Sequence, residues 1–85
     1  MGAGDRGPYA HEQAVFRDLL RRVRREAGLR QQDLAARLDV PQSFVSKVET
    51  GERRLDVIEL RRICLALDVP LPEFIARLDV ALNES

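Results

Sequence analysis

A run of short polar side chains lies at helical spacing in the middle of the chain. If residues 42–50 form a helix, an arc of about 140° is polar throughout and consists of Gln42, Ser43, Ser46, Lys47 and Thr50. The opposite arc is apolar. Glutamine can form two hydrogen bonds to adenine, serine can bond a base or a phosphate, and lysine can reach guanine or a phosphate. The polar arc therefore has the chemistry of a nucleic-acid-binding surface, although an ordinary solvated helix face has a similar composition.

Few residues are suited to catalysis or metal binding. Cys64 is the single cysteine, which excludes an internal disulfide and a cysteine-rich zinc site. His11 is the single histidine and lies in a polar N-terminal segment, where it is poorly placed to serve a catalytic triad. We therefore predict no enzymatic activity, no metal site and no cofactor, and we interpret Cys64 as a small buried hydrophobic residue.

The net charge of zero hides an uneven distribution along the chain. The 14 basic and 14 acidic residues balance overall. Residues 17–54 contain 10 basic and 6 acidic residues, whereas residues 55–85 contain 3 and 6. Thirteen of the 14 cations are arginines, whose planar guanidinium suits phosphate contacts. The basic middle of the chain is therefore a candidate DNA-backbone-binding region, above all at Arg53 and Arg54, which follow the polar arc in an expected loop.

The length and composition indicate one small soluble domain. The chain has 85 residues, of which 45% are hydrophobic and 33% charged. No apolar run approaches the length of a membrane span, and the N-terminal residues MGAGDRGPY lack the apolar segment of a signal peptide. We therefore expect a cytoplasmic protein without a membrane partner. A domain this small buries only about 60% of its unfolded surface, so oligomerisation is plausible from the outset.

Apolar periodicity predicts an all-α fold with five helices. We expect the helices at about residues 12–27, 31–38, 41–50, 57–67 and 71–83. No segment alternates with a period of two residues, so no strand is predicted. Residues 1–10 are predicted to be a flexible tail and residues 11–85 a single domain.

Capping signals support these boundaries. Gly28 is expected to end the first helix in a Schellman-type cap, and Asp39 to adopt a left-handed turn conformation after the second. Asp56 and Glu59 have the spacing of a capping box at the start of the fourth helix.

Residues 31–49, QQDLAARLDVPQSFVSKVE, have the spacing of a helix-turn-helix. With the flanking phrases REAGLRQQDLAARLDV, PQSFVSKVETGERR and ELRRICLALDV, residues 16–69 resemble the phage-repressor and Cro-type helix-turn-helix family, which is also described as xenobiotic-response-element-like. The resemblance implies a compact lambda-repressor-like bundle of five helices that binds double-stranded operator DNA and usually dimerises. Two positions depart from the family pattern. Arg30 replaces the usual Ser or Thr cap, and Asp39 replaces the usual turn glycine.

The resemblance also assigns roles to individual residues. It places base contacts at Gln42, Ser43 and Lys47, and a phosphate contact at Gln31. Arg24 and Glu49, each at the edge of an apolar arc, match a structural ion pair of the family. The complete set of expected DNA-backbone contacts is Gln31, Gln32, Ser46, Thr50, Arg53 and Arg54.

The fifth helix carries an apolar stripe formed by Leu71, Phe74, Ile75, Leu78, Ala81 and Leu82. The stripe either completes the core of the monomer or forms a two-fold dimer contact, and we predict the dimer contact. Two copies would then read a roughly palindromic operator whose half-sites lie about 34 Å apart.

We predict a sequence-specific transcriptional regulator that binds its operator as a homodimer. Specialised roles within this class are restriction-modification controller, antitoxin and phage repressor. The alternative from another class is a protein-interaction module that has lost DNA binding. No ligand-binding domain is visible, so we expect no small-molecule ligand.

Overall fold

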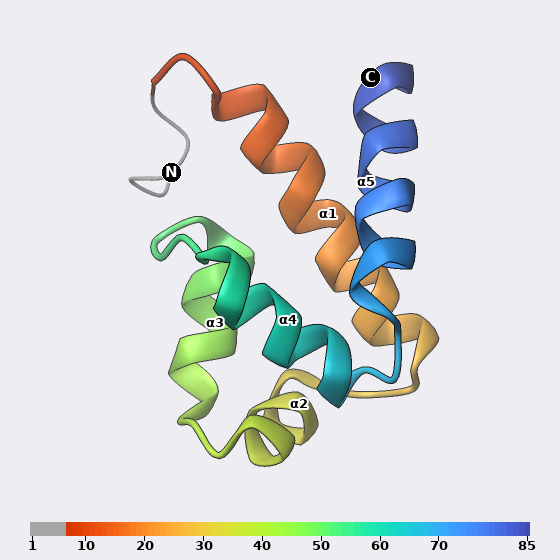
Figure 1. Cartoon of the computed structure of the whole chain (residues 1–85). Coiled ribbons are helices and arrows are strands. Elements are labelled where there is room, and N and C mark those ends of the chain that lie inside the picture. The colour runs from red at the N-terminus through yellow and green to blue at the C-terminus, as the bar shows by residue number, and fades with distance from the viewer. Residues whose placement is uncertain (1–6) are drawn as a thin grey trace.

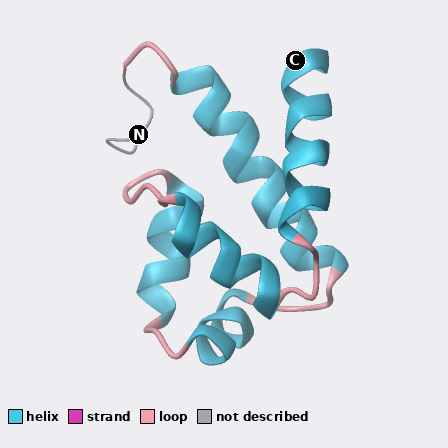
Figure 2. Cartoon of the chain, viewed as in Figure 1, coloured by secondary structure: helices cyan, strands magenta, loops and turns pink. Residues whose placement is uncertain are grey.

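The structure is a computed structural model that describes residues 7–85. This part of the chain forms five helices and no strand: α1 (Ala10–Glu26), α2 (Gln31–Leu38), α3 (Gln42–Thr50), α4 (Val57–Ala66) and α5 (Leu71–Glu84) (Figures 1 and 2). The predicted all-α class and the bounds of α2 are confirmed. α1 begins at Ala10, earlier than expected and within the segment predicted to be a tail. Residues 1–6 of that tail lie outside the described residues.

Four helices end in the same way, with one residue in the left-handed conformation. These residues are Gly28, Asp39, Gly51 and Asp68, with φ angles of 75°, 58°, 88° and 60°. In each case the next residue donates its N–H to a carbonyl five positions back, as from Leu29 to Arg24 at 3.2 Å. This is the Schellman arrangement, which satisfies carbonyls that the helix leaves unpaired. The expectations for Gly28 and Asp39 are confirmed, whereas the left-handed Asp68 was not anticipated.

Two helices begin with reciprocal side-chain caps. At α4 the Glu59 N–H donates to Asp56 Oδ1 at 2.7 Å and the Asp56 N–H donates to Glu59 Oε1 at 3.0 Å, which confirms the predicted capping box. At α2, Arg30 has no acceptor to offer the helix. The Asp33 carboxylate instead accepts from the Arg30 backbone N–H at 2.8 Å and from its guanidinium at 3.0 Å. The hydrogen bond from the N-cap backbone to the Asp33 carboxylate, one of the two bonds of a capping box, is therefore present although the usual Ser or Thr is absent.

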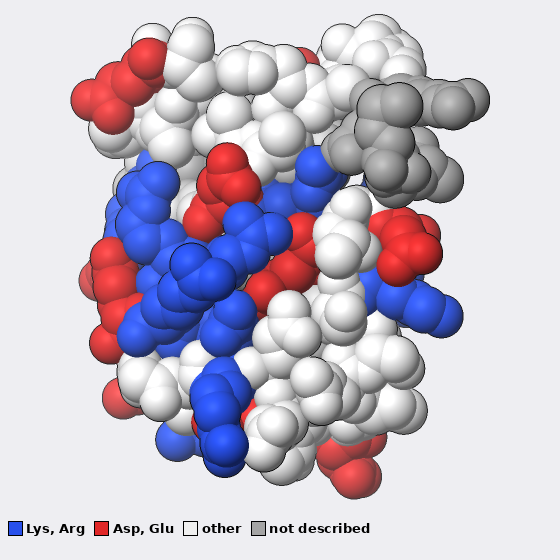
Figure 3. All heavy atoms as spheres, turned by 180° about the vertical axis from the view of Figure 1, so that it is seen from behind, with Lys and Arg blue, Asp and Glu red and all other residues white. Residues whose placement is uncertain are grey.

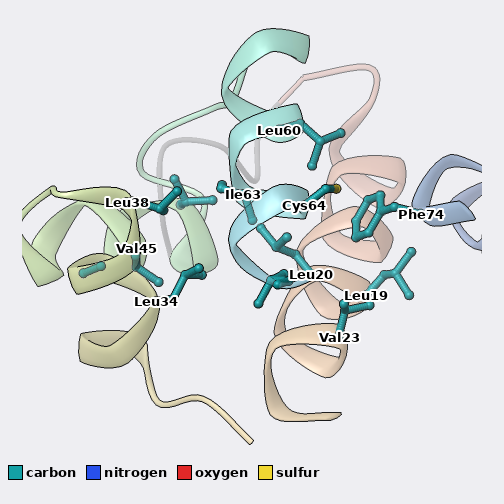
Figure 4. Close-up of a cluster of buried hydrophobic side chains, with 13 residues drawn as sticks. Leu19, Leu20, Val23, Leu34, Leu38, Val45, Leu60, Ile63, Cys64 and Phe74 are labelled. Atoms are coloured by element: carbon teal, nitrogen blue, oxygen red, sulfur yellow. The ribbon is translucent and has the colours of Figure 1, made fainter. Parts of the chain in front are cut away.

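The helices pack around one hydrophobic core (Figure 4). α2 packs against α3 and α4, α1 against α3 and α5, and α4 against α5. The buried apolar residues come from all five helices and from the end of α4: Leu19, Leu20, Val23, Leu34, Ala35, Leu38, Val45, Val48, Leu60, Ile63, Cys64, Leu67 and Phe74. Burial raises the pKa of the Cys64 thiol, which agrees with the expectation of a buried hydrophobic residue.

Phe74 corrects part of the predicted dimer contact. Its side chain is 0% exposed, and its ring meets Phe16 edge-on with 6.1 Å between the centroids. A residue buried in its own monomer has no surface to offer a second copy, so the assignment of Phe74 to the dimer interface is wrong. Of the remaining stripe, Ile75 is exposed, and the partly buried residues are Leu71, Leu78, Ala81 and Leu82.

No helix in the described part of the chain combines the length and the apolar character needed to span a lipid bilayer.

Candidate nucleic-acid interface

α3 presents its polar arc to solvent. Gln42, Ser43, Lys47 and Thr50 are exposed, and Ser46 is half-buried. The opposite side of the same helix places Val45 and Val48 in the core. The Thr50 hydroxyl donates to the Lys47 carbonyl at 3.2 Å and lies 3.2 Å from a carboxylate oxygen of Glu52. The three predicted base-contacting side chains therefore share one accessible face of a helix whose other face is anchored.

A buried polar network fixes the orientation of α3. The Arg24 guanidinium donates to both carboxylate oxygens of Glu49, at 2.7 and 3.0 Å, and both side chains are buried. The expected ion pair is thus present. Arg24 also donates to the Leu29 carbonyl at 2.8 Å, and Arg21 donates to the Glu49 carbonyl at 2.8 Å. These contacts join α1, the turn that follows it and the C-terminal end of α3.

The N-terminus of α2 joins the same network. The Gln31 amide donates to Glu49 Oε1 at 3.0 Å, which places α2 against the end of α3. Gln32 is exposed. Of the two glutamines expected to contact phosphate, Gln31 is therefore held by the protein, whereas Gln32 faces solvent.

The loop after α3 separates the two arginines that sequence reasoning had grouped together. Arg54 is exposed. Arg53 turns back onto the protein and forms an ion pair with Glu59 at 2.7 Å. Helical spacing gives no signal for the Arg53–Glu59 pair, because Arg53 lies in the loop and Glu59 lies in the first turn of α4.

Gly51, which opens this loop, is favoured at this position by its backbone conformation. Its φ of 88° is one that other residues rarely adopt. A Cβ at this position would also lie 3.0 Å from the Arg17 guanidinium carbon. The sequence pattern predicts no role for Arg17, yet its guanidinium lies against the start of the loop that follows α3.

Basic residues also gather on the outer face of α1. Figure 3 shows Lys and Arg side chains in a band across the middle of the molecule as seen from behind, beside several carboxylates. On α1 itself, Arg22 and Arg25 are exposed, whereas Asp18 pairs with Arg21 at 3.0 Å. The zero net charge of the chain therefore coexists with locally basic surface.

Metal ligands are not gathered in this part of the structure. Among residues 7–85, no three His, Cys, Asp or Glu side chains lie close enough together to hold a metal ion.

The family model described as helix-turn-helix matches residues 20–74. The chain belongs to the XRE-type helix-turn-helix family. It is a DNA-binding transcription regulator. The matched segment contains α2 and α3 completely, together with the Arg24–Glu49 network and the Arg53–Arg54 loop. The resemblance inferred from the sequence is thereby confirmed.

Individual proteins that are similar to this chain include an XRE-family-like protein and two control proteins. An XRE-family-like protein from Pseudomonas syringae pv. tomato str. DC3000 is 42% identical, and the match covers 85% of this chain and 88% of that protein with a TM-score of 0.79. The wild-type restriction-modification controller protein C.Esp1396I is 24% identical, with 84% and 93% covered and a TM-score of 0.77. The control protein C.MunI of a Mycoplasma species is 28% identical over 65 residues, which are 75% of this chain and 88% of that protein. The predicted lambda-repressor-like fold is confirmed.

Proposed function

We propose that this regulator reads its operator with the polar arc of α3. Gln42, Ser43 and Lys47 contact bases in the major groove. Backbone contacts come from Gln31, Gln32, Ser46, Thr50 and Arg54. The observation that carries the proposal is the exposure of the polar arc on a helix whose position is fixed by the buried Arg24–Glu49 pair. A rigid element positions base-reading side chains more accurately than a mobile loop does.

We further propose that two copies bind a roughly palindromic operator. Large apolar side chains are exposed on α4, where Val57, Ile58 and Leu65 are each more than half exposed. Ile75 of α5 is 42% exposed. Large exposed apolar side chains on neighbouring helices are candidates for an interaction site. The proposed dimer surface therefore consists of the outer face of α4 and the edge of α5 at Ile75.

A groove lined by Val57 gives part of this surface its shape. It has a volume of about 320 Å³ and lies between the start of α1, the start of α4 and the end of α5. Its lining includes Phe16, Leu55, Val57, Leu78 and Leu82. Of the predicted dimer residues, Leu78 and Leu82 remain in the proposal as groove walls, whereas Leu71 and Ala81 do not line this groove. Val57 and Ile58 are additions from the structure.

Charge also favours pairing between copies. α4 exposes Arg61 and Arg62, and α5 exposes Glu73, Asp79 and Glu84. A two-fold contact in which α4 of one copy meets α5 of the other would place opposite charges around an apolar centre. The same arrangement keeps the acidic α5 away from the DNA and leaves the basic middle of each chain facing it.

The specialised role that we propose is that of a restriction-modification controller. The similarity to the control protein C.MunI extends over 88% of that protein. The present chain offers the same small unit, which acts by binding and catalyses no reaction. Antitoxin and phage repressor are the other roles open to such a unit, and the neighbouring genes distinguish the three.

Selection of binding sites from a random DNA library with the purified protein tests the proposal. We expect a palindromic motif. On the selected site, Gln42→Ala should cost about 1–3 kcal/mol and relax the preference at one base position. Arg54→Ala should weaken binding to all sequences similarly and reduce the salt slope by about one contact. If no motif is enriched and random DNA binds only weakly, the chain is instead a protein-interaction module that has kept the fold.

A further inference from the structure

Arg53 follows α3 in the basic loop, and its side chain is 40% exposed, yet its guanidinium is turned towards groups of the protein. Its Nη2 donates to Glu59 Oε2 at 2.7 Å, and its Nη1 lies 3.2 Å from Glu59 Oε1. The Nη1 group also donates to the Arg54 carbonyl at 3.0 Å. The guanidinium carbon lies 4.5 Å from the centre of the Phe44 ring, which is the geometry of a cation–π contact. One side chain therefore touches α3, the loop and α4.

Glu59 is also held in place by a hydrogen bond that does not involve Arg53. Its Oε1 accepts the Asp56 backbone N–H at 3.0 Å as part of the capping box of α4. The hydrogen bonds from Arg53, followed by that from Asp56, hold the pKa of Glu59 below its ordinary value. The carboxylate is thus ionised and held in place at the first turn of α4, where it forms a rigid anchor for the guanidinium.

The two helices joined by Arg53 have little other packing between them. α3 packs against α1 and α2, whereas α4 packs against α2 and α5. Phe44 and Glu59 line the same open groove of about 270 Å³, together with Val40 and Ile63. Residues of both α3 and α4 line this open groove, and Arg53 contacts one lining residue of each helix, Phe44 and Glu59.

We propose that Arg53 is a positioning residue, which holds α3 at the angle that presents its polar arc to DNA, and that its guanidinium does not contact phosphate. The proposal concerns the same surface as the proposed operator reading. Moving Arg53 to a phosphate would break a two-point ion pair and a ring contact. It would also leave the Glu59 carboxylate without its cation close to the negatively charged DNA. Arg54 is adjacent, exposed and able to make that contact.

Nuclear magnetic resonance of the full chain tests where the guanidinium lies. In the free protein, the Phe44 ring current should shift the Arg53 side-chain protons upfield, and Phe44→Leu should abolish the shift. On addition of a random-sequence duplex and of the selected operator, the upfield shift should remain. Its loss on DNA binding would show that Arg53 leaves the protein for the phosphate and would overturn the proposal. The free-protein measurement needs no operator, so it stands even if no operator is found.

The substitution Glu59→Gln distinguishes a positioning role of Arg53 from a phosphate-contacting role, because the two roles predict opposite changes in DNA affinity. Glutamine keeps the capping box but removes the charged partner of Arg53. If Arg53 only positions α3, operator affinity should fall about tenfold, the ratio of operator to random-DNA affinity should fall with it, and the salt slope should stay unchanged. If Arg53 contacts phosphate, the freed arginine and the lost negative charge should instead tighten binding to every sequence.

Two further variants complete the test. Arg53→Lys keeps the charge but loses the two-point geometry and the stacking, so it should reproduce the loss seen in Glu59→Gln. Arg54→Gln is the matched control and should lower the salt slope by about 0.9. Arg53→Lys binding at wild-type strength, or Arg53→Gln lowering the slope as Arg54→Gln does, would overturn the proposal. Thermal melts followed by circular dichroism establish that each variant is folded.

Discussion

The Glu49 side chain of α3 is bound by residues of two other helices, α1 and α2. Arg24 of α1 binds both of its carboxylate oxygens, and Gln31 of α2 donates to one of them. Every buried side-chain nitrogen or oxygen within residues 7–85 has a hydrogen-bond partner. A fully satisfied buried pair adds little stability by itself, but removing one member leaves an uncompensated charge in the interior.

Glu49→Ala should therefore destabilise the fold by about 3–5 kcal/mol. Each kcal/mol lowers the Tm of a domain of this size by roughly 4–8 °C, so the variant should melt far below the wild type in a circular-dichroism scan. Glu84→Ala, which removes an exposed carboxylate near the C-terminus, is the control and should melt close to the wild type. Equal melting temperatures for the two variants would mean that Arg24 is satisfied without Glu49.

Single residues were predicted well where a local pattern specifies them. The Arg24–Glu49 pair followed from the edge of two apolar arcs and from the family pattern. Phe74 was misplaced because a helical stripe identifies a face but not its depth. Phe74 and Ile75 lie towards opposite edges of the stripe, about 100° apart on the helix, and only Phe74 is buried. The Arg53–Glu59 pair could not be predicted because its geometry depends on the path of a loop.

At the scale of the element, helix ends were more predictable than their packing. The sequence Leu-Asp-Val-Pro occurs at residues 38–41 and again at residues 67–70. In both places the Asp is left-handed and the Val donates its N–H back into the helix. The repeat was the signal that could have identified Asp68 as a second left-handed cap. The early start of α1 carried no such signal, since Tyr9 supplies no side-chain cap.

Asp39→Gly should stabilise the protein by about 0.5–1 kcal/mol. Glycine adopts the left-handed conformation without steric cost, although its freedom in the unfolded chain offsets part of the gain. A carboxylate at the C-terminal end of α2 is also unfavourable for the helix dipole. Asp39→Asn isolates the charge from the backbone conformation and should give a smaller gain. Urea unfolding midpoints measure both, and a lower midpoint for both variants would show that the Asp39 carboxylate makes a stabilising contact.

The Arg30–Asp33 cap should make stability depend on pH. Hydrogen bonds from the Arg30 side chain, and then from its backbone, lower the pKa of Asp33 to about 2. Because the folded pKa lies below the unfolded value of about 3.9, the cap contributes fully at neutral pH and is lost as the pH falls from about 4 towards 2. Asp33→Asn should lower the Tm at pH 7 and make the decline in acid shallower. An acid profile parallel to that of the wild type would contradict this origin.

At the scale of the whole molecule, the two proposed interaction surfaces lie on different elements. α2, α3 and the Arg53–Arg54 loop form the proposed DNA surface, and the outer face of α4 with one edge of α5 forms the proposed dimer surface. The sequence predicts individual residues of the first surface because the helix-turn-helix spacing is specific, and those DNA contacts stay predictions. It predicted the second only in part, because the exposed apolar residues of α4 alternate with Arg61 and Arg62 and do not form a continuous stripe.

Ile58→Glu should dissociate the proposed dimer without unfolding the monomer. Ile58 is 65% exposed, so its replacement leaves the core intact, and the new charge would be buried without a designed partner at the two-fold contact. We expect the dimer dissociation constant to rise at least tenfold, and operator affinity to fall with it while binding to random DNA changes little. Sedimentation velocity at micromolar concentration measures the mass, with circular dichroism as the control for folding.

Val80→Glu is the matched control for this experiment. Val80 is 55% exposed, but it lines a different groove, with Leu19 and Arg22 of α1, and should leave the mass unchanged. Joining two copies of the Ile58→Glu variant by a flexible linker should restore operator binding, because the linker replaces the lost contact with a high effective concentration. A wild-type chain that stays monomeric at micromolar concentration and binds a single half-site at full strength would exclude the dimer. Restored operator binding by the linked variant would instead show that Ile58 affects DNA binding through dimer formation. It would also show that α3 of each copy reads its half-site without the natural dimer contact.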